Sequence, residues 1–155
     1  MAKAPKATHE EFVFHVRAPS LTYSFAIEHD RKRRQWSPFA ERESVEFVTE
    51  CIWPDRLKGR EGTATLYPEP ALVDHKLLDA DDVRRKWIGH VQATKGRFET
   101  TVWLPPPVCW RLAEAMTSGL VRSMLINSLI ESPSMHRVTS ASFYGQEFDP
   151  VAYVA

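Results

Sequence analysis

Two short basic runs, each followed by a tryptophan, carry the residue types best suited to hold a partner. The first run, with the aromatics behind it, is Arg31, Lys32, Arg33, Arg34, Trp36 and Phe39. The second run consists of Arg84, Arg85 and Lys86. Arginine and tryptophan are the commonest anchors of protein interfaces. The first group is therefore the leading candidate for partner contact, and the second is a secondary basic patch.

The same chemistry also suits nucleic acid, because cations neutralise phosphates and aromatic rings stack on unpaired bases. The chain, however, carries 20 Lys and Arg against 20 Asp and Glu, so its formal net charge is zero. A protein that binds a bulk polyanion has a large positive excess. Acidic residues also flank both runs. Nucleic acid is thus the disfavoured alternative, and a protein partner or self-association is preferred.

The densest acidic segment, residues 74–82, raises the question of a metal. Clustered carboxylates bind hard cations, but the glycine and closing glutamate of a calcium-binding EF-hand loop are missing. Asp79 or Asp81 capping a short helix is the preferred interpretation. No metal and no cofactor are expected, and metal binding by the segment stays open.

No motif in the chain predicts a catalytic residue. The six histidines show no ligand spacing, and neither a nucleophile elbow nor a glycine-rich phosphate loop is present. Cys109 follows three prolines at an expected helix N-terminus, which favours the reactive thiolate, but its apolar neighbours favour a core position. An enzyme or small-ligand binder using His90 or His136 remains a third hypothesis.

The compartment is predicted from cysteine usage and hydropathy. Cys51 and Cys109 lie far apart in the sequence, which is typical of free, partly buried thiols in a reducing cytoplasm. No apolar run approaches the roughly 18 residues needed to span a membrane. The N-terminal residues do not form a secretory signal. A cytoplasmic protein is expected.

The elements that must position these candidates are predicted from period-two alternation of apolar and polar residues. Strands are expected at 12–16, ending near Pro19, and at 21–27, 45–53 and 62–67. The polar segment 29–43 is expected to be a long loop, and loops of about 15 residues are often functional. This loop contains the first basic run.

The second half of the chain contains the clearest local signals. Two alternating runs around Lys95-Gly96 predict a β-hairpin over 87–104. The three prolines 105–107, followed by apolar residues at helical spacing, predict a helix over 106–118, with Gly119 just after its end. Residues 120–130 fit a strand or a continued helix, and the strand is favoured. The turn at 131–134 leads to a segment 136–144 rich in valine, threonine and aromatic residues, which predicts a second, C-terminal hairpin.

These elements predict a mainly β protein. The expected architecture is an antiparallel β-sandwich or flattened barrel of about eight strands, with one helix near 106–118. The alternative is an α+β fold with a longer helical segment over 106–130. Residues 1–10 are expected to be a flexible tail and 11–155 a single domain. The function predicted is a non-enzymatic binding or assembly module, and 17 aromatic residues with an unpaired edge strand favour self-association.

Overall fold

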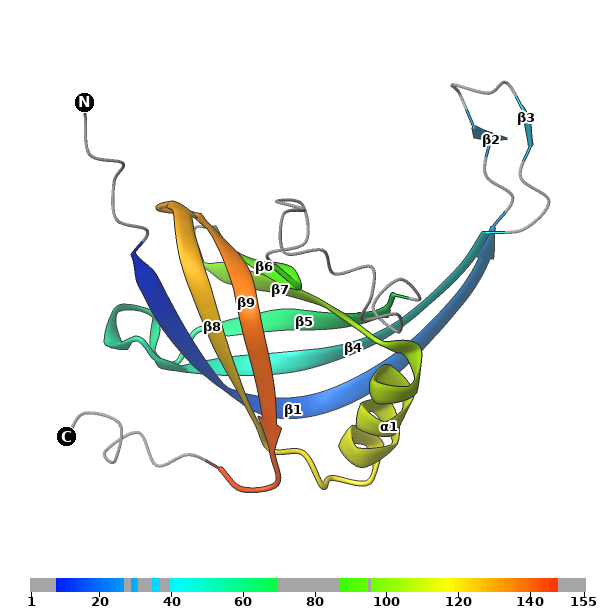
Figure 1. The fold of residues 1–155 in the computed structure, drawn as a ribbon. Coiled ribbons are helices and arrows are strands. Elements are labelled where there is room, and N and C mark those ends of the chain that lie inside the picture. Colours follow the sequence, from blue (N-terminus) through cyan, green and yellow to red (C-terminus); the bar gives the residue numbers. More distant parts are fainter. Residues whose placement is uncertain are drawn as a thin grey trace, which may run out of the picture.

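The computed structural model describes the backbone of residues 8–26, 29–30, 35–36, 40–69, 87–94 and 96–147, and the side chains of 8–17, 44–69, 87–94 and 96–147. Within these ranges, seven strands close into a barrel and one α-helix packs against it (Figure 1). The predicted mainly β class with one helix is confirmed. Of the two expected architectures the barrel is found.

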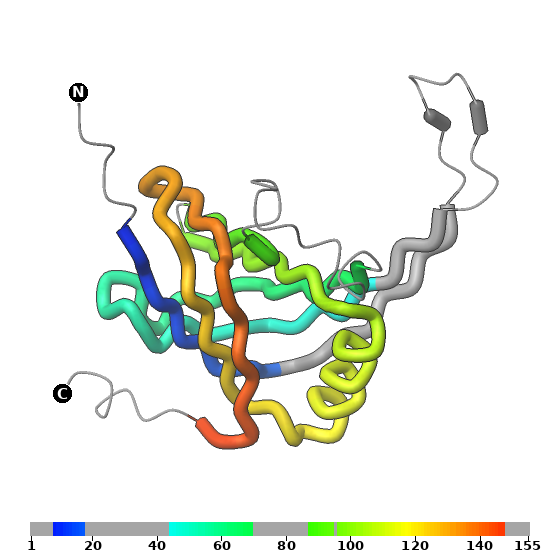
Figure 2. The backbone as a smooth tube through the Cα atoms, in the orientation of Figure 1, coloured from blue at the N-terminus to red at the C-terminus, as the bar shows by residue number. Residues whose placement is uncertain are grey.

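The barrel strands are β1 (His9–Ala26), β4 (Ala40–Trp53), β5 (Glu61–Pro68), β6 (Gly89–Thr94), β7 (Arg97–Leu104), β8 (Ser123–Ser132) and β9 (Met135–Tyr144). Their order is β1-β4-β5-β7-β6-β9-β8, and β8 closes the ring by pairing with the first half of β1 (Figure 2). All neighbours are antiparallel except β5 and β7, which are parallel. The remaining elements are β2 (His29–Asp30), β3 (Gln35–Trp36), the 3-10 turn η1 (Asp55–Leu57) and α1 (Pro106–Thr117).

The N-terminal third of the chain differs from the prediction. The two strands expected at 12–16 and 21–27 are one strand, β1, which begins at His9 inside the expected tail. Its pairing with β4 shifts register between Val16 and Pro19. A proline has no N–H to donate to a neighbouring strand. The sequence predicted that the strand would end there, but the strand continues past Pro19 through a local bulge. The predicted loop 29–43 contains β2, β3 and the first residues of β4.

The C-terminal half follows the prediction closely. The β6–β7 hairpin turns at Gly96, whose φ of +98° is a left-handed conformation that favours glycine. Helix α1 starts after Pro105 and ends at Thr117, and Gly119 takes a φ of +72° just after it. Residues 123–132 form strand β8, which pairs with β9 as the second hairpin. The α+β alternative with a helix over 106–130 is therefore wrong.

The barrel interior is filled by the apolar face of each strand. Its largest fully buried side chains include Phe12, Phe14, Phe47, Phe98, Met124 and Ile126. Helix α1 buries Cys109, Ala113 and Met116 against the same core. It covers the right-hand end of the barrel in Figure 1, whereas the β4–β5 connection, which carries η1, lies at the left. Among the residues described, no helix is long and apolar enough to cross a membrane.

Candidate functional site

Most of the predicted contact residues fall outside the described ranges. These are Arg31, Lys32, Arg33, Arg34, Phe39, Arg84, Arg85 and Lys86, together with the acidic segment 74–82. Trp36 lies in β3, where its backbone pairs with His29. Strands β1 and β4, which precede and follow the first basic run in the sequence, are both described and pair with each other.

The chain reaches and leaves the first basic run through a two-stranded β-ribbon. Strand β1 pairs with β8 only as far as His15, and β4 begins to pair with β5 at Val45. Between these limits, Thr22–Ala26 pairs with Ala40–Ser44 in five consecutive residue pairs. In the part of the chain that the structure describes, neither segment has a second strand neighbour. These two segments are called the β1–β4 ribbon below.

The ribbon differs chemically from the barrel because its outer edges are unpaired among the described residues. An edge strand presents backbone N–H and C=O groups that can pair with a strand of another chain. The β2–β3 sheet follows the ribbon in the sequence, and the four residues between β2 and β3 are Arg31–Arg34. Free backbone edges and the predicted side-chain anchors therefore belong to one continuous segment.

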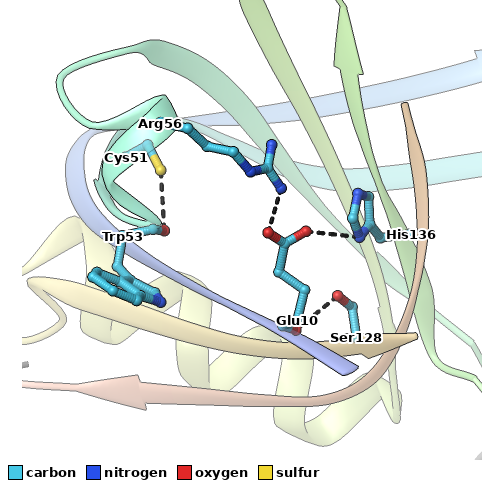
Figure 3. Close-up of polar contacts among 6 residues, drawn as sticks. All are labelled: Glu10, Cys51, Trp53, Arg56, Ser128 and His136. Carbon is cyan, nitrogen blue, oxygen red and sulfur yellow. Dashed lines mark hydrogen bonds and ion pairs between the residues drawn. The ribbon is translucent and has the colours of Figure 1, made fainter. Parts of the chain in front are cut away.

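A second candidate is a buried polar cluster at the N-terminal end of β1 (Figure 3). Glu10 precedes Phe12 by two residues, so its side chain shares the interior face of β1. Arg56 of η1 donates a hydrogen bond to Glu10 Oε1. His136 Nδ1, on β9, lies 3.3 Å from Glu10 Oε2, and the histidine side chain is only 2% exposed. Ser128 Oγ donates to the backbone oxygen of Glu10 at 2.9 Å.

The electrostatics of this cluster favour an uncharged imidazole. Burial lowers the pKa of His136, and the nearby Glu10 carboxylate only partly opposes that effect. Although they lie close, His136 Nδ1 and Glu10 Oε2 are each buried without a hydrogen-bond partner. The ring also packs edge-on against Phe12, with 5.1 Å between ring centroids. Glu10 and His136 thus form a polar pair in the packed interior, and Arg56 contacts this pair from the surface.

Sequence reasoning missed Glu10, although a signal for it was present. The alternation of Phe12 and Phe14 extends backward to Glu10 and places it on the interior face. A lone carboxylate at such a position normally marks the end of a strand, because burying a charge without a partner is costly. Arg56, 46 residues away in the chain, supplies the partner.

A third feature is a groove on the outer face of β4, β5 and β7, called the β5–β7 groove below. It consists of two adjoining hollows of about 380 and 320 Å³, and Thr63 and Glu99 line both. Other lining residues are Glu46, Glu61, Thr65 and Arg97. Neither hollow is lined by Glu10 or His136. The groove is therefore separate from the buried cluster, and its charged lining residues are three glutamates and Arg97.

The nucleophile candidates lie in the core. Neither Cys51 nor Cys109 forms a disulfide, and both side chains are fully buried. Burial raises the pKa of the Cys51 thiol to about 12, and its Sγ donates to the backbone oxygen of Trp53 at 3.1 Å. The core interpretation of Cys109 is confirmed. His90, on the outer face of β6, lies beside Trp103 with 5.9 Å between ring centroids.

Comparisons with protein-family models, with curated proteins and with solved structures found no match for this chain. No residue role is therefore carried over from a relative.

Proposed function

We propose that this protein is a binding or assembly module that acts through protein–protein contacts. In this proposal the closed barrel is the scaffold, and the β1–β4 ribbon with the segment it carries is the contact surface. The observation that carries the proposal is the ribbon itself, in which Thr22–Ala26 and Ala40–Ser44 pair only with each other among the described residues. A partner strand can add to either edge, and flanking side chains provide the selectivity.

The packing of the barrel argues against a ligand carried in its lumen. Barrels of about eight strands have interiors just wide enough to be filled by side chains, and this barrel has seven. The rings of Phe12 and Phe14 stack with centroids 6.0 Å apart, and Phe98 packs edge-on against Phe14. Binding at the outside of the molecule is therefore favoured over binding inside it.

The proposal is tested by a double variant, Arg33→Glu with Trp36→Ala. The matched control, Lys58→Glu with Leu120→Ala, reverses one exposed cation and shortens one exposed apolar side chain outside the ribbon. We expect the first variant to lose co-purifying partners or self-association in sedimentation velocity, and the control to retain them. Unchanged partners and oligomeric state in the first variant would show that this segment is not the contact.

The nucleic-acid alternative makes a different prediction for the same variants. Binding through phosphates weakens steeply as salt rises, because condensed counterions are released. A titration with single-stranded oligonucleotides at two salt concentrations separates the two functions. Salt-sensitive binding that the Arg33→Glu and Trp36→Ala variant loses would replace the protein-contact proposal with a nucleic-acid one.

A further inference from the structure

The two edges of the β1–β4 ribbon differ in charge. On β1, residues 18–26 contain no Asp, Glu, Lys or Arg. On β4, the ribbon segment contains three consecutive charged residues, Glu41, Arg42 and Glu43. Charged residues on an edge strand oppose pairing with another chain, and an edge without them permits it. The β1 edge is therefore better suited than the β4 edge to accept a further strand.

Hydrogen bonds in the barrel define the direction of the backbone groups in the ribbon. The N–H of Cys51 donates to the backbone oxygen of Arg60, so the backbone groups of Cys51 point toward β5. This direction alternates along a strand, and β4 keeps its register with β5 back to Val45, so Val45 also points toward β5. Leu21 lies opposite Val45 on β1. The N–H and C=O of Leu21 therefore point away from β4.

Tyr23 and Phe25 follow Leu21 at alternate positions, so their backbone groups also point away from β4. Pro19 precedes them at the same alternation, where a residue without an N–H removes no hydrogen bond from the β1–β4 pairing. Strand β8 pairs with β1 only as far as His15, so within the described ranges no strand lies on this side of the ribbon. The outward groups of these residues are therefore available to a strand of another molecule.

The β1 edge is complementary to itself under two-fold symmetry. When two such edges run antiparallel about Tyr23, each Tyr23 lies opposite Tyr23 of the second copy, and Leu21 lies opposite Phe25. This register pairs all three outward residues with outward residues, and each pair exchanges two hydrogen bonds. It also places apolar residues opposite apolar residues and brings no like charges together. We propose that the protein forms a two-fold dimer in which the β1 edges of two copies pair antiparallel, centred on Tyr23.

The β4 edge lacks this self-complementarity. Glu41 and Glu43 lie opposite Phe25 and Tyr23, so their backbone groups also point outward. Any antiparallel pairing of this edge with itself sets glutamate opposite glutamate, and like charges directly opposite each other destabilise a sheet. A two-fold contact closes after two copies, so the expected assembly is a dimer. This inference rests on the proposed function, because it names the partner that the ribbon contacts.

Two proline variants of the full chain test the inference at the same level of the ribbon. Tyr23→Pro removes an outward N–H from the β1 edge, and Glu43→Pro, directly opposite, removes one from the β4 edge. Neither substitution removes an N–H that β1 and β4 exchange. In sedimentation velocity we expect Glu43→Pro to dimerise like wild type and Tyr23→Pro to dimerise at least about tenfold more weakly. Circular dichroism verifies that each variant is folded.

A cysteine cross-link tests the register without relying on proline. Hydrogen-bonded antiparallel partners have Cα atoms about 5.5 Å apart, which is within reach of a disulfide. Tyr23→Cys is therefore expected to give a disulfide-linked dimer on addition of oxidised glutathione, as measured by non-reducing electrophoresis. The control Glu43→Cys is expected to remain unlinked, and the native Cys51 and Cys109 are buried.

Three results would overturn the inference: a monomeric wild type at high micromolar concentration, a Tyr23→Pro variant that dimerises like wild type, or equal cross-linking at positions 23 and 43. Failure of the proposed function gives a different result. If the dimer is absent while Arg33→Glu with Trp36→Ala still removes a co-purifying partner, the ribbon contact stands and only the second copy is lost as its partner.

Discussion

Strands β1 and β4 pass through two different environments, and the contrast separates the barrel scaffold from the proposed contact surface. In the barrel, β1 lies between β4 and β8, and its residues Phe12, Val13 and Phe14 are at most 1% exposed. In the ribbon, the same two strands pair only with each other within the described ranges. Barrel closure removes sheet edges, whereas the ribbon keeps them. Each of these two continuous strands thus has one part packed in the closed barrel and one part with an unpaired edge among the described residues.

This division predicts that the largest effect on stability comes from the barrel half of β1. Phe14 is fully buried and packs against both Phe12 and Phe98. We expect Phe14→Ala to lower the free energy of unfolding by about 3–5 kcal/mol, because it removes a buried ring and leaves a cavity. Urea denaturation followed by circular dichroism measures this change. A loss below about 1 kcal/mol would mean that the interior is loosely packed.

The next effect tests how closely the barrel strands approach one another. A Cβ added to Gly89 would lie 1.9 Å from the backbone oxygen of Thr101, so the strands would have to separate. We expect Gly89→Ala to cost about 3 kcal/mol. The matched control is Gly59→Ala, where φ is +76° and nothing lies within 4 Å, so only the left-handed strain of about 1 kcal/mol is expected. Equal losses in the two variants would contradict the close strand approach at Gly89.

A smaller effect on the free energy of unfolding, confined to a range of pH, is expected from His136. Burial lowers the pKa of His136 below its ordinary value of 6.5 in the folded protein. The unfolded chain therefore binds the proton more readily, so stability is full above about pH 6.5 and falls as pH decreases toward the lowered pKa. Glu10 and Arg56 are the charged groups that face the ring.

The variant His136→Phe removes this titration, and Nδ1 has no aligned hydrogen bond to lose. We expect the free energy of unfolding to depend less on pH between about pH 7 and pH 5 in this variant than in wild type. His9→Gln, at an exposed position of β1, is the control substitution, because it leaves the His136 ring and its contribution to the slope in place. If the free energy of unfolding has the same pH dependence in His136→Phe as in wild type, His136 does not titrate in this range.

The smallest expected effect is that the two buried thiols do not react with an alkylating reagent in the folded protein. Cys51 and Cys109 are fully buried, and the thiolate needed for alkylation is further disfavoured at Cys51, whose pKa is raised to about 12 by burial. Iodoacetamide should leave both unmodified in the native protein and should modify both in denaturant, as measured by mass spectrometry. Rapid native modification of Cys109 would restore the hypothesis of a reactive cysteine.

The parts of the fold that were predictable from sequence depend on local signals. The β6–β7 hairpin is specified by alternation around Gly96, and α1 by the prolines before it and Gly119 after it. Pro19 was interpreted as the end of a strand because proline usually interrupts pairing, but it lies next to a register shift within β1. The closed ring and the parallel β5–β7 pair depend on contacts between distant segments, which no local pattern specifies.

The candidate site was predictable only in part, for a similar reason. The basic and aromatic residue types of the first run are visible in the sequence. The ribbon is not, because it depends on where β1 stops pairing with β8 and where β4 starts pairing with β5. The groove depends on the parallel register that brings Thr63 beside Glu99. The Glu10 cluster depends on Arg56 and His136, which come from other elements.

The most direct test of the division between scaffold and contact is removal of the ribbon. Thr22 and Ser44 are paired, so Tyr23–Glu43 can be replaced by Asn-Gly, which favours the two-residue turn of a hairpin. Urea denaturation and sedimentation velocity are then measured on the shortened and the intact chains. We expect the free energy of unfolding to change by less than about 1 kcal/mol and self-association or partner capture to be lost. Loss of the folded barrel, or retention of every contact in a folded shortened chain, would contradict the account.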